Sequence, residues 1–275
     1  MRKHSTQKLS RVSTLHYVKL VFRAALFLAA AVIYLTRRIQ NVQVYLAGYD
    51  RLPLILVLIW LVFVVEMIFR FFPSRVESMG CQKQFARNYK STGKNTPVLQ
   101  ASQTTFLVAA AWIALNAGIA ALYFTNVIDE GILLLICLAY SVCDMICILF
   151  FCPFQTWFMK NKCCTSCRIY NWDYAMMFTP LILVKSYYTW SLLGIALILL
   201  LKWEILARVH PERFSETTNQ NLSCACCQEK LCHHKRQLRT FLSRNAHELH
   251  LKGNALISKA GTLRRKDLKQ KKRDS

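Results

Sequence analysis

The chain alternates long apolar runs with short basic segments, and this alternation constrains its fold more than any other feature. The runs 53–72, 106–124 and 132–151 are nearly free of charge, and each approaches the roughly 20 residues that an α-helix needs to cross a bilayer. A hydrophobic content of 54% together with a net charge of +22 is unusual in a soluble domain but expected of apolar spans joined by basic loops. We therefore predict an all-α polytopic integral membrane protein.

Three further runs are shorter. The run 24–36 reaches a full crossing only if it begins near Lys19, with Lys19 and Arg23 extending towards the interface. The last two runs share residues 174–206, for which one long tilted helix is the alternative. That helix would place a basic tail outside the cell, so we predict two short helices that turn near the aromatic segment 187–190. The six predicted spans are 19–36, 53–72, 105–125, 131–152, 173–188 and 190–207.

The charge distribution predicts the orientation. The N-terminal segment and the loops 73–104 and 153–173 together carry fourteen Lys and Arg, whereas the three opposite loops carry three. Basic segments near a span favour the cytosol, which places both termini there (N-in/C-in). The basic N-terminus then covers 1–18, the membrane domain 19–206 and the tail 207–275. We interpret the first span as uncleaved, and the lack of a cleaved targeting segment favours a prokaryotic cell membrane.

Cysteines form two clusters, one in the loop 153–173 and one in the tail, and each contains a C-x-x-C pair. Two predicted spans separate them, so the chain returns to the same side. Thiols are reduced in the cytosol, and four thiolates suit tetrahedral zinc or an iron–sulfur cluster. The alternative is unrelated clusters that are palmitoylated or purely structural. The predicted metal ligands are Cys164, Cys167, Cys224 and Cys227, with Cys163, Cys226, Cys232, His233 and His234 as alternates.

Ionisable residues also occur within the predicted spans. Glu66 and Arg70 are four residues apart, so they share a helix face and are expected to pair. Lys185 is expected to extend outward, and Asp144 has no partner on its own helix. The alternative interpretation is a proton or ion path through Glu66, Asp144 and Lys185, because charges inside a membrane usually serve a function.

Two basic or interfacial segments suggest contacts with lipid. Arg168 and Asp173 could bind a headgroup, with Trp172 as an interfacial anchor; the alternative for Arg168 is a plain cytosolic charge. The segment 208–275 carries 16 Lys and Arg against six Asp and Glu. A basic tail tethered to a membrane is expected to bind anionic lipid headgroups, and nucleic acid is a less suitable partner.

No P-loop, dinucleotide-binding fingerprint or hydrolase motif occurs in the sequence. The sequence therefore indicates no substrate, and whether the protein is an enzyme stays open. Our first functional hypothesis is a membrane protein with a structural or regulatory zinc or iron–sulfur centre. The second is a small transporter or intramembrane enzyme that uses Asp144, Glu66 and Lys185. The third is a redox protein with an iron–sulfur cluster.

Overall fold

The structure is a computed structural model, and it describes residues 11–39, 54–73, 79–94, 96–98, 102–159, 166–223 and Cys226. These residues form helices and connecting segments, with one isolated bridge between Ser91 and Asn219 and no strand among them. The predicted all-α class is confirmed. The α-helices are α1 (Arg11–Ile39), α2 (Leu54–Phe71), α3 (Met79–Gln82), α4 (Ser102–Phe124), α5 (Glu130–Leu149), α6 (Asp173–Phe178) and α7 (Tyr187–Val209). Shorter elements are η1 (Ala86–Asn88), η2 (Phe154–Phe158), η3 (Tyr170–Trp172), η4 (Thr179–Leu183), η5 (Pro211–Arg213) and η6 (Gln220–Leu222).

Within the part of the chain that the structure describes, three helices are long and apolar enough to cross a membrane. The segments are Ser13–Thr36 in α1, Gln103–Phe124 in α4 and Glu130–Leu149 in α5. They agree with the first, third and fourth predicted spans. The prediction of transmembrane helices is therefore supported, whereas the number of six spans and the orientation of the termini stay predictions.

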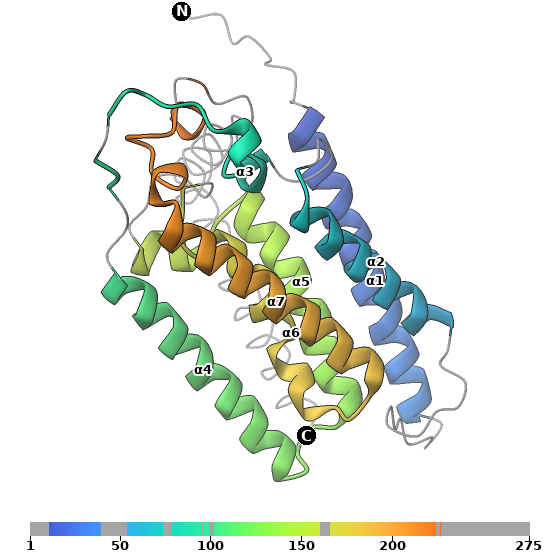
Figure 1. The fold of residues 1–275 in the computed structure, drawn as a ribbon. Helices are drawn as coiled ribbons and strands as arrows, with labels where there is room; N and C mark the ends of the chain where they lie inside the picture. The colour runs from blue at the N-terminus through green and yellow to red at the C-terminus, as the bar shows by residue number, and fades with distance from the viewer. Residues whose placement is uncertain are drawn as a thin grey trace, which may run out of the picture. The chain divides into compact units, whose positions relative to one another are not determined.

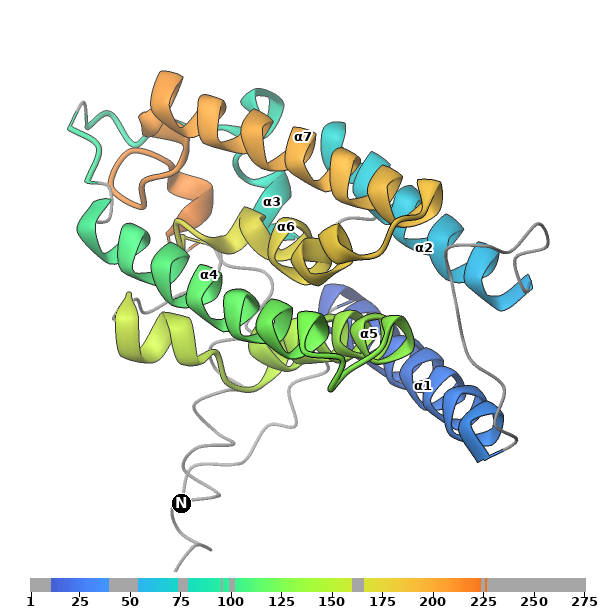
Figure 2. The same cartoon turned by 90° about the horizontal axis from the view of Figure 1, so that it is seen from below.

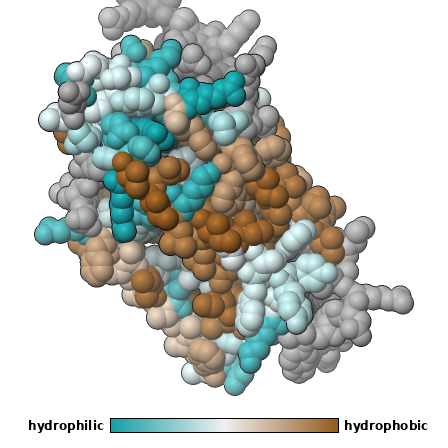
Figure 3. Space-filling view, in the orientation of Figure 1, coloured by the Kyte–Doolittle hydropathy of each residue, from teal (hydrophilic) through white to brown (hydrophobic). Residues whose placement is uncertain are grey.

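The surface of these helices is unusually apolar. Large hydrophobic side chains are exposed along α1, α2, α4 and α7; Phe106 is 73% exposed and Val32 61%. Figure 3 shows hydrophobic residues in a broad region across the middle of the molecule, with mainly hydrophilic residues above it and residues of both kinds below it. Soluble monomers rarely expose apolar surface on this scale, so a lipid environment accounts for it.

The fifth predicted span, 173–188, is not a regular helix. It consists of α6 followed by the 3-10 segment η4, which contains Pro180, and the chain turns at Val184–Ser186 before α7. Six α-helical and five 3-10 residues extend about 19 Å, less than the roughly 30 Å of a bilayer core. The predicted turn near 187–190 lies at the start of α7, which runs unbroken for 23 residues.

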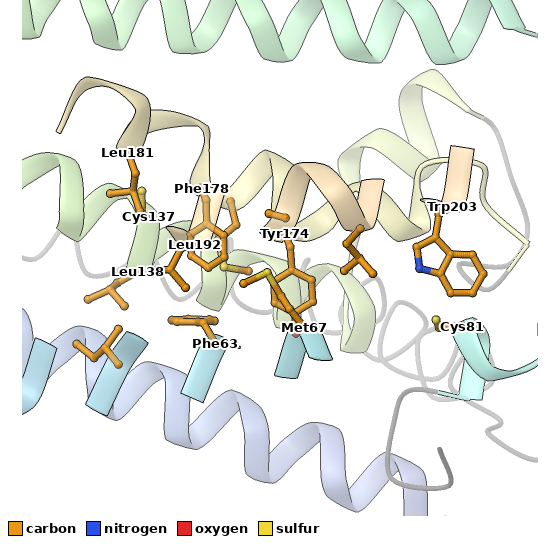
Figure 4. Packing of buried hydrophobic residues seen from close by; sticks show 14 of the residues in the cluster. Phe63, Met67, Cys81, Cys137, Leu138, Tyr174, Phe178, Leu181, Leu192 and Trp203 are labelled. Carbon is orange, nitrogen blue, oxygen red and sulfur yellow. The ribbon is translucent and has the colours of Figure 1, made fainter. Parts of the chain in front are cut away.

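The helices pack around α6. In Figures 1 and 2, α6 lies between α7 and α5, while α2 packs on α7 and α1 on α5. The core between these helices holds Phe63 of α2 against Phe178 of α6, edge to face at 5.2 Å between ring centroids, as Figure 4 shows. The short α6 is therefore the central element on which the longer helices are assembled.

The start of α5 is fitted closely to α1. Asp129 Oδ1 accepts a hydrogen bond from Ile132 N at 2.8 Å and caps the helix, while Oδ2 accepts one from the hydroxyl of Tyr34 at 2.8 Å. A Cβ at Gly131 would lie 2.6 Å from two ring carbons of Tyr34. The approach of α1 to α5 thus requires glycine at this position.

The loop before α4 docks on the chain that follows α7. Asn219 is fully buried, and its Nδ2 donates to the carbonyls of Lys83 at 3.0 Å and Arg213 at 2.9 Å. Thr92 N donates to Thr218 O at 3.0 Å. The described part of this loop contains the brief α3 and η1. These contacts anchor residues 79–98 to 211–223.

Candidate functional site

Arg23 of α1 is the centre of a buried charged cluster. Its side chain is 2% exposed, and Nη2 donates to Glu66 Oε2 of α2 at 2.6 Å. Nη1 donates to Asp144 Oδ2 of α5 at 3.1 Å and to the carbonyl of Ser141 at 3.1 Å. One guanidinium therefore joins three helices. We call Arg23, Glu66 and Asp144, with Lys19 and Tyr174, the Arg23 cluster.

The two carboxylates of the Arg23 cluster are held unequally. Glu66 has three partners: Arg23, Lys19 Nζ at 3.5 Å and the Tyr174 hydroxyl, which donates to Oε2 at 3.0 Å. Asp144 has Arg23 as its partner, and its Oδ1 accepts no hydrogen bond from the residues that the structure describes. Asp144 is therefore the carboxylate that is freer to take up another cation or a proton.

A second buried pair lies beside the Arg23 cluster. Arg70 of α2 binds Asp173 of α6 through two contacts, Nη1 to Oδ1 at 2.8 Å and Nη2 to Oδ2 at 2.6 Å. The guanidinium of Arg70 also lies over the ring of Tyr174, 4.6 Å from its centroid. Such two-point pairing fixes the geometry of both groups.

These contacts correct two predictions. The expected pairing of Glu66 with Arg70 is wrong, because carboxylate and guanidinium each find a partner on another helix. The expectation that Arg23 extends to the interface is also wrong, since its side chain is buried among Glu66, Asp144 and the ring of Phe63. Ion pairs between helices therefore offset the cost of removing these charges from water.

Lys185 is not part of the Arg23 cluster. It lies in the turn between η4 and α7, its side chain is exposed, and no ion pair or hydrogen bond to it occurs among the described residues. The structure thus joins Glu66 with Asp144 through Arg23 and leaves the third predicted polar residue apart from them.

The predicted interfacial residues all have partners within the chain. Arg168 Nη2 donates to Glu204 Oε2 of α7 at 2.6 Å, and Trp172 Nε1 donates to Glu204 Oε1 at 2.7 Å. Asp173 binds Arg70. These contacts attach the segment before α6 to the end of α7, and a role in binding lipid stays a prediction.

A cavity of about 140 Å³ adjoins the charged residues. It is bounded by α4, α5, α6 and the connecting segments near Cys152 and Cys167, and both Asp144 and Asp173 line it. Aromatic rings form much of its wall, among them Trp112 and Tyr140 with centroids 4.8 Å apart. Asp144 therefore faces two environments, the buried Arg23 and an open space suited to a small ligand.

Most of the predicted metal ligands lie outside the described residues: Cys163, Cys164, Cys224, Cys227, Cys232, His233 and His234. Cys167 is described; it is buried and lines the cavity, and Cys226 is exposed. No group of three or more His, Cys, Asp and Glu that could hold a metal occurs in the described part of the chain. A zinc or iron–sulfur centre therefore stays a prediction.

Comparison with protein-family models, with curated proteins and with solved structures found no match to this chain. Its function must therefore be argued from its own geometry. Sequence reasoning missed Arg23, Tyr174 and Glu204 as members of polar contacts. The sequence feature that pointed to Arg23 was its position directly before the uncharged run 24–36. That position was interpreted as the end of a membrane span.

Proposed function

We propose that the protein is a small membrane transporter in which Asp144 binds a proton or a small cation and Arg23 is the charged centre of the path. The observation that carries this proposal is the sharing of one buried guanidinium by two unequal carboxylates, the weaker-held of which lines a cavity. Charged groups inside a membrane are costly and usually mark ion or substrate pathways.

The unequal partners supply a mechanism. With Asp144 ionised, Arg23 binds both carboxylates. When Asp144 takes up a proton or cation from the cavity, Arg23 keeps its 2.6 Å contact with Glu66, which Lys19 and Tyr174 also hold in place. The cluster thus has two arrangements that differ mainly in the state of Asp144. A transport cycle needs such a pair of states, each accessible without exposing a bare charge.

Proton flux into liposomes tests the proposal. The full chain is reconstituted with a pH-sensitive dye enclosed, and an imposed potassium diffusion potential drives uptake. We expect the wild-type protein to increase flux over protein-free liposomes and Asp144→Asn to remove that increase. The small-cation arm repeats the assay with sodium, potassium and methylammonium gradients at matched pH.

The matched control is Asp129→Asn. Asp129 lies at the start of the same helix outside the Arg23 cluster, and asparagine also caps helices well. Flux should survive this change. Flux in Asp144→Asn equal to wild type, or no transport of any tested ion by the wild-type protein, would refute the proposal.

A cytosolic metal centre on the two cysteine clusters is the second candidate function. Ser166, next to Cys167, donates a hydrogen bond to Glu216 Oε1 at 2.6 Å, and Glu216 lies eight residues before Cys224 in the sequence. Together with the attachment of Arg168 and Trp172 to Glu204, this contact supports a meeting of the loop and the tail at one end of the bundle.

Elemental analysis tests the metal centre. Purified protein should contain zinc or iron, and Cys164→Ser with Cys227→Ser should remove it; a brown colour would indicate an iron–sulfur cluster and favour the redox function. Protein free of both metals when purified anaerobically would end this candidate. Labelling of Cys226 and Lys185 from either side of sealed vesicles tests the proposed orientation, with both termini in the cytosol.

A further inference from the structure

The cavity beside Asp144 is rich in sulfur. Cys and Met supply 12 and 7 of the 275 residues in the chain, yet they supply six of the fifteen that line this cavity. The six are Cys143, Cys147, Cys152, Cys167, Met176 and Met177. Cysteine in a membrane helix is commonly a small hydrophobic residue, but that role does not explain why sulfur atoms from several separate segments surround one space.

The arrangement of these residues follows from the local structure. Cys143 and Cys147 are four residues apart on α5 and so share the face that borders the cavity. The chain then leaves α5, and Cys152, three residues past the end of this helix, lines the same cavity. Met176, on α6, lines the cavity from another side.

Thiolate and thioether ligands select Cu(I), zinc and iron–sulfur clusters. Tetrahedral zinc needs four donors, and the described residues offer no group of even three His, Cys, Asp and Glu. Cu(I) can be bound by only two thiolates, and a thioether can be added as a third donor. The remainder of the wall is largely aromatic and aliphatic, as at Trp112 and Ile148.

We propose that this cavity binds one Cu(I) ion between Cys147 and Cys152, with Met176 as a supplementary thioether ligand. The proposal rests on the sulfur residues and goes beyond the transport proposed for Asp144. Two Cu–S bonds form, and each thiol gives up its proton to the solvent. The oxidation state of copper does not change, so no electron donor or acceptor is needed. The bound centre carries one net negative charge.

Titration with Cu(I) in the absence of oxygen tests the site. Six of the predicted cytosolic cysteine ligands must first be removed, and Cys167, which lines the cavity, is kept. The background protein is therefore the full chain with serine at these positions: Cys163, Cys164, Cys224, Cys226, Cys227 and Cys232. A coloured Cu(I) chelator competes for the ion. We expect the background protein to withdraw one equivalent of Cu(I) from the chelator, and Cys147→Ser with Cys152→Ser to withdraw none.

Cys137→Ala is the matched control. Cys137 lies on α5, is buried in the central core and does not line the cavity, so its removal should leave the equivalent of Cu(I) in place. Copper X-ray absorption of the loaded background protein should show sulfur ligands. The inference is overturned if the background protein withdraws no Cu(I), if the Cys147 and Cys152 variant withdraws as much as the background, or if the absorption shows only nitrogen and oxygen ligands. Circular dichroism verifies that each variant is folded.

Discussion

Replacing Arg23 with methionine is the most direct test of the Arg23 cluster. Methionine keeps an unbranched side chain, shorter than that of arginine, and removes the charge. Arg23 is 2% exposed and holds two carboxylates from different helices, and removing one partner of a buried ion pair costs about 3–5 kcal/mol. For a protein near this size 1 kcal/mol corresponds to about 2–4 °C, so we expect the melting temperature to fall by roughly 10 °C.

The structure also predicts which second substitution rescues the variant. Glu66 retains Lys19 and Tyr174 after Arg23 is lost, whereas Asp144 loses its one ion-pair partner among the described residues. Asp144→Asn should therefore restore most of the lost stability, and Glu66→Gln should restore less. The assay is thermal unfolding in detergent micelles, followed by tryptophan fluorescence. The reasoning is refuted if Arg23→Met melts within about 2 °C of wild type, below the shift that 1 kcal/mol produces, or if Glu66→Gln is the better rescue.

Two other substitutions test the packing of the fold. Gly131→Ala should destabilise the protein by about 1–3 kcal/mol, because the new Cβ would lie 2.6 Å from the ring of Tyr34. The control is Gly118→Ala, where nothing lies within 4 Å of the new Cβ. Thermal melting compares the two variants. Asn219→Ala should destabilise the protein by about 1–3 kcal/mol for each carbonyl left without its donor. It should also speed hydrogen exchange of the Gln220 amide, which donates to Lys90 O at 2.8 Å. The control is Gln220→Ala, which changes an exposed side chain. Equal exchange in both variants would contradict the docking of residues 79–98 on 211–223.

The long helices could be predicted from the sequence because the bilayer sets one simple requirement. An uncharged run of about 20 residues has few alternatives to a membrane helix, and 105–125 and 131–152 agree with α4 and α5 within a few residues. The fifth span, 173–188, was harder. Its composition is equally apolar, but Pro180 cannot donate a backbone hydrogen bond, and the helix gives way to 3-10 turns there.

The site could be predicted only in part, because the ion-pair partners of Glu66 and Arg70 lie on other helices. The sequence identified Glu66 and Asp144 as charges in apolar surroundings, and a local rule then paired Glu66 with Arg70 because they share a face of α2. That rule holds for an isolated helix, where a pair four residues apart gains only about 0.2–0.5 kcal/mol. A partner across the bundle is worth more once both charges have left water, and Arg23 and Asp173 are such partners.

Those partners are 43 and 103 residues away along the chain, and no periodicity in the sequence links them. What the sequence does contain is a balance: Lys19, Arg23 and Arg70 match Glu66, Asp144 and Asp173 in number, and all six carry partners in the bundle. Counting charges within apolar helices, and requiring them to pair across helices rather than along them, would have put Arg23 inside the bundle. Neutralising Asp144 alone would disturb this balance, and this supports our proposal that a proton or cation changes the state of the Arg23 cluster through Asp144.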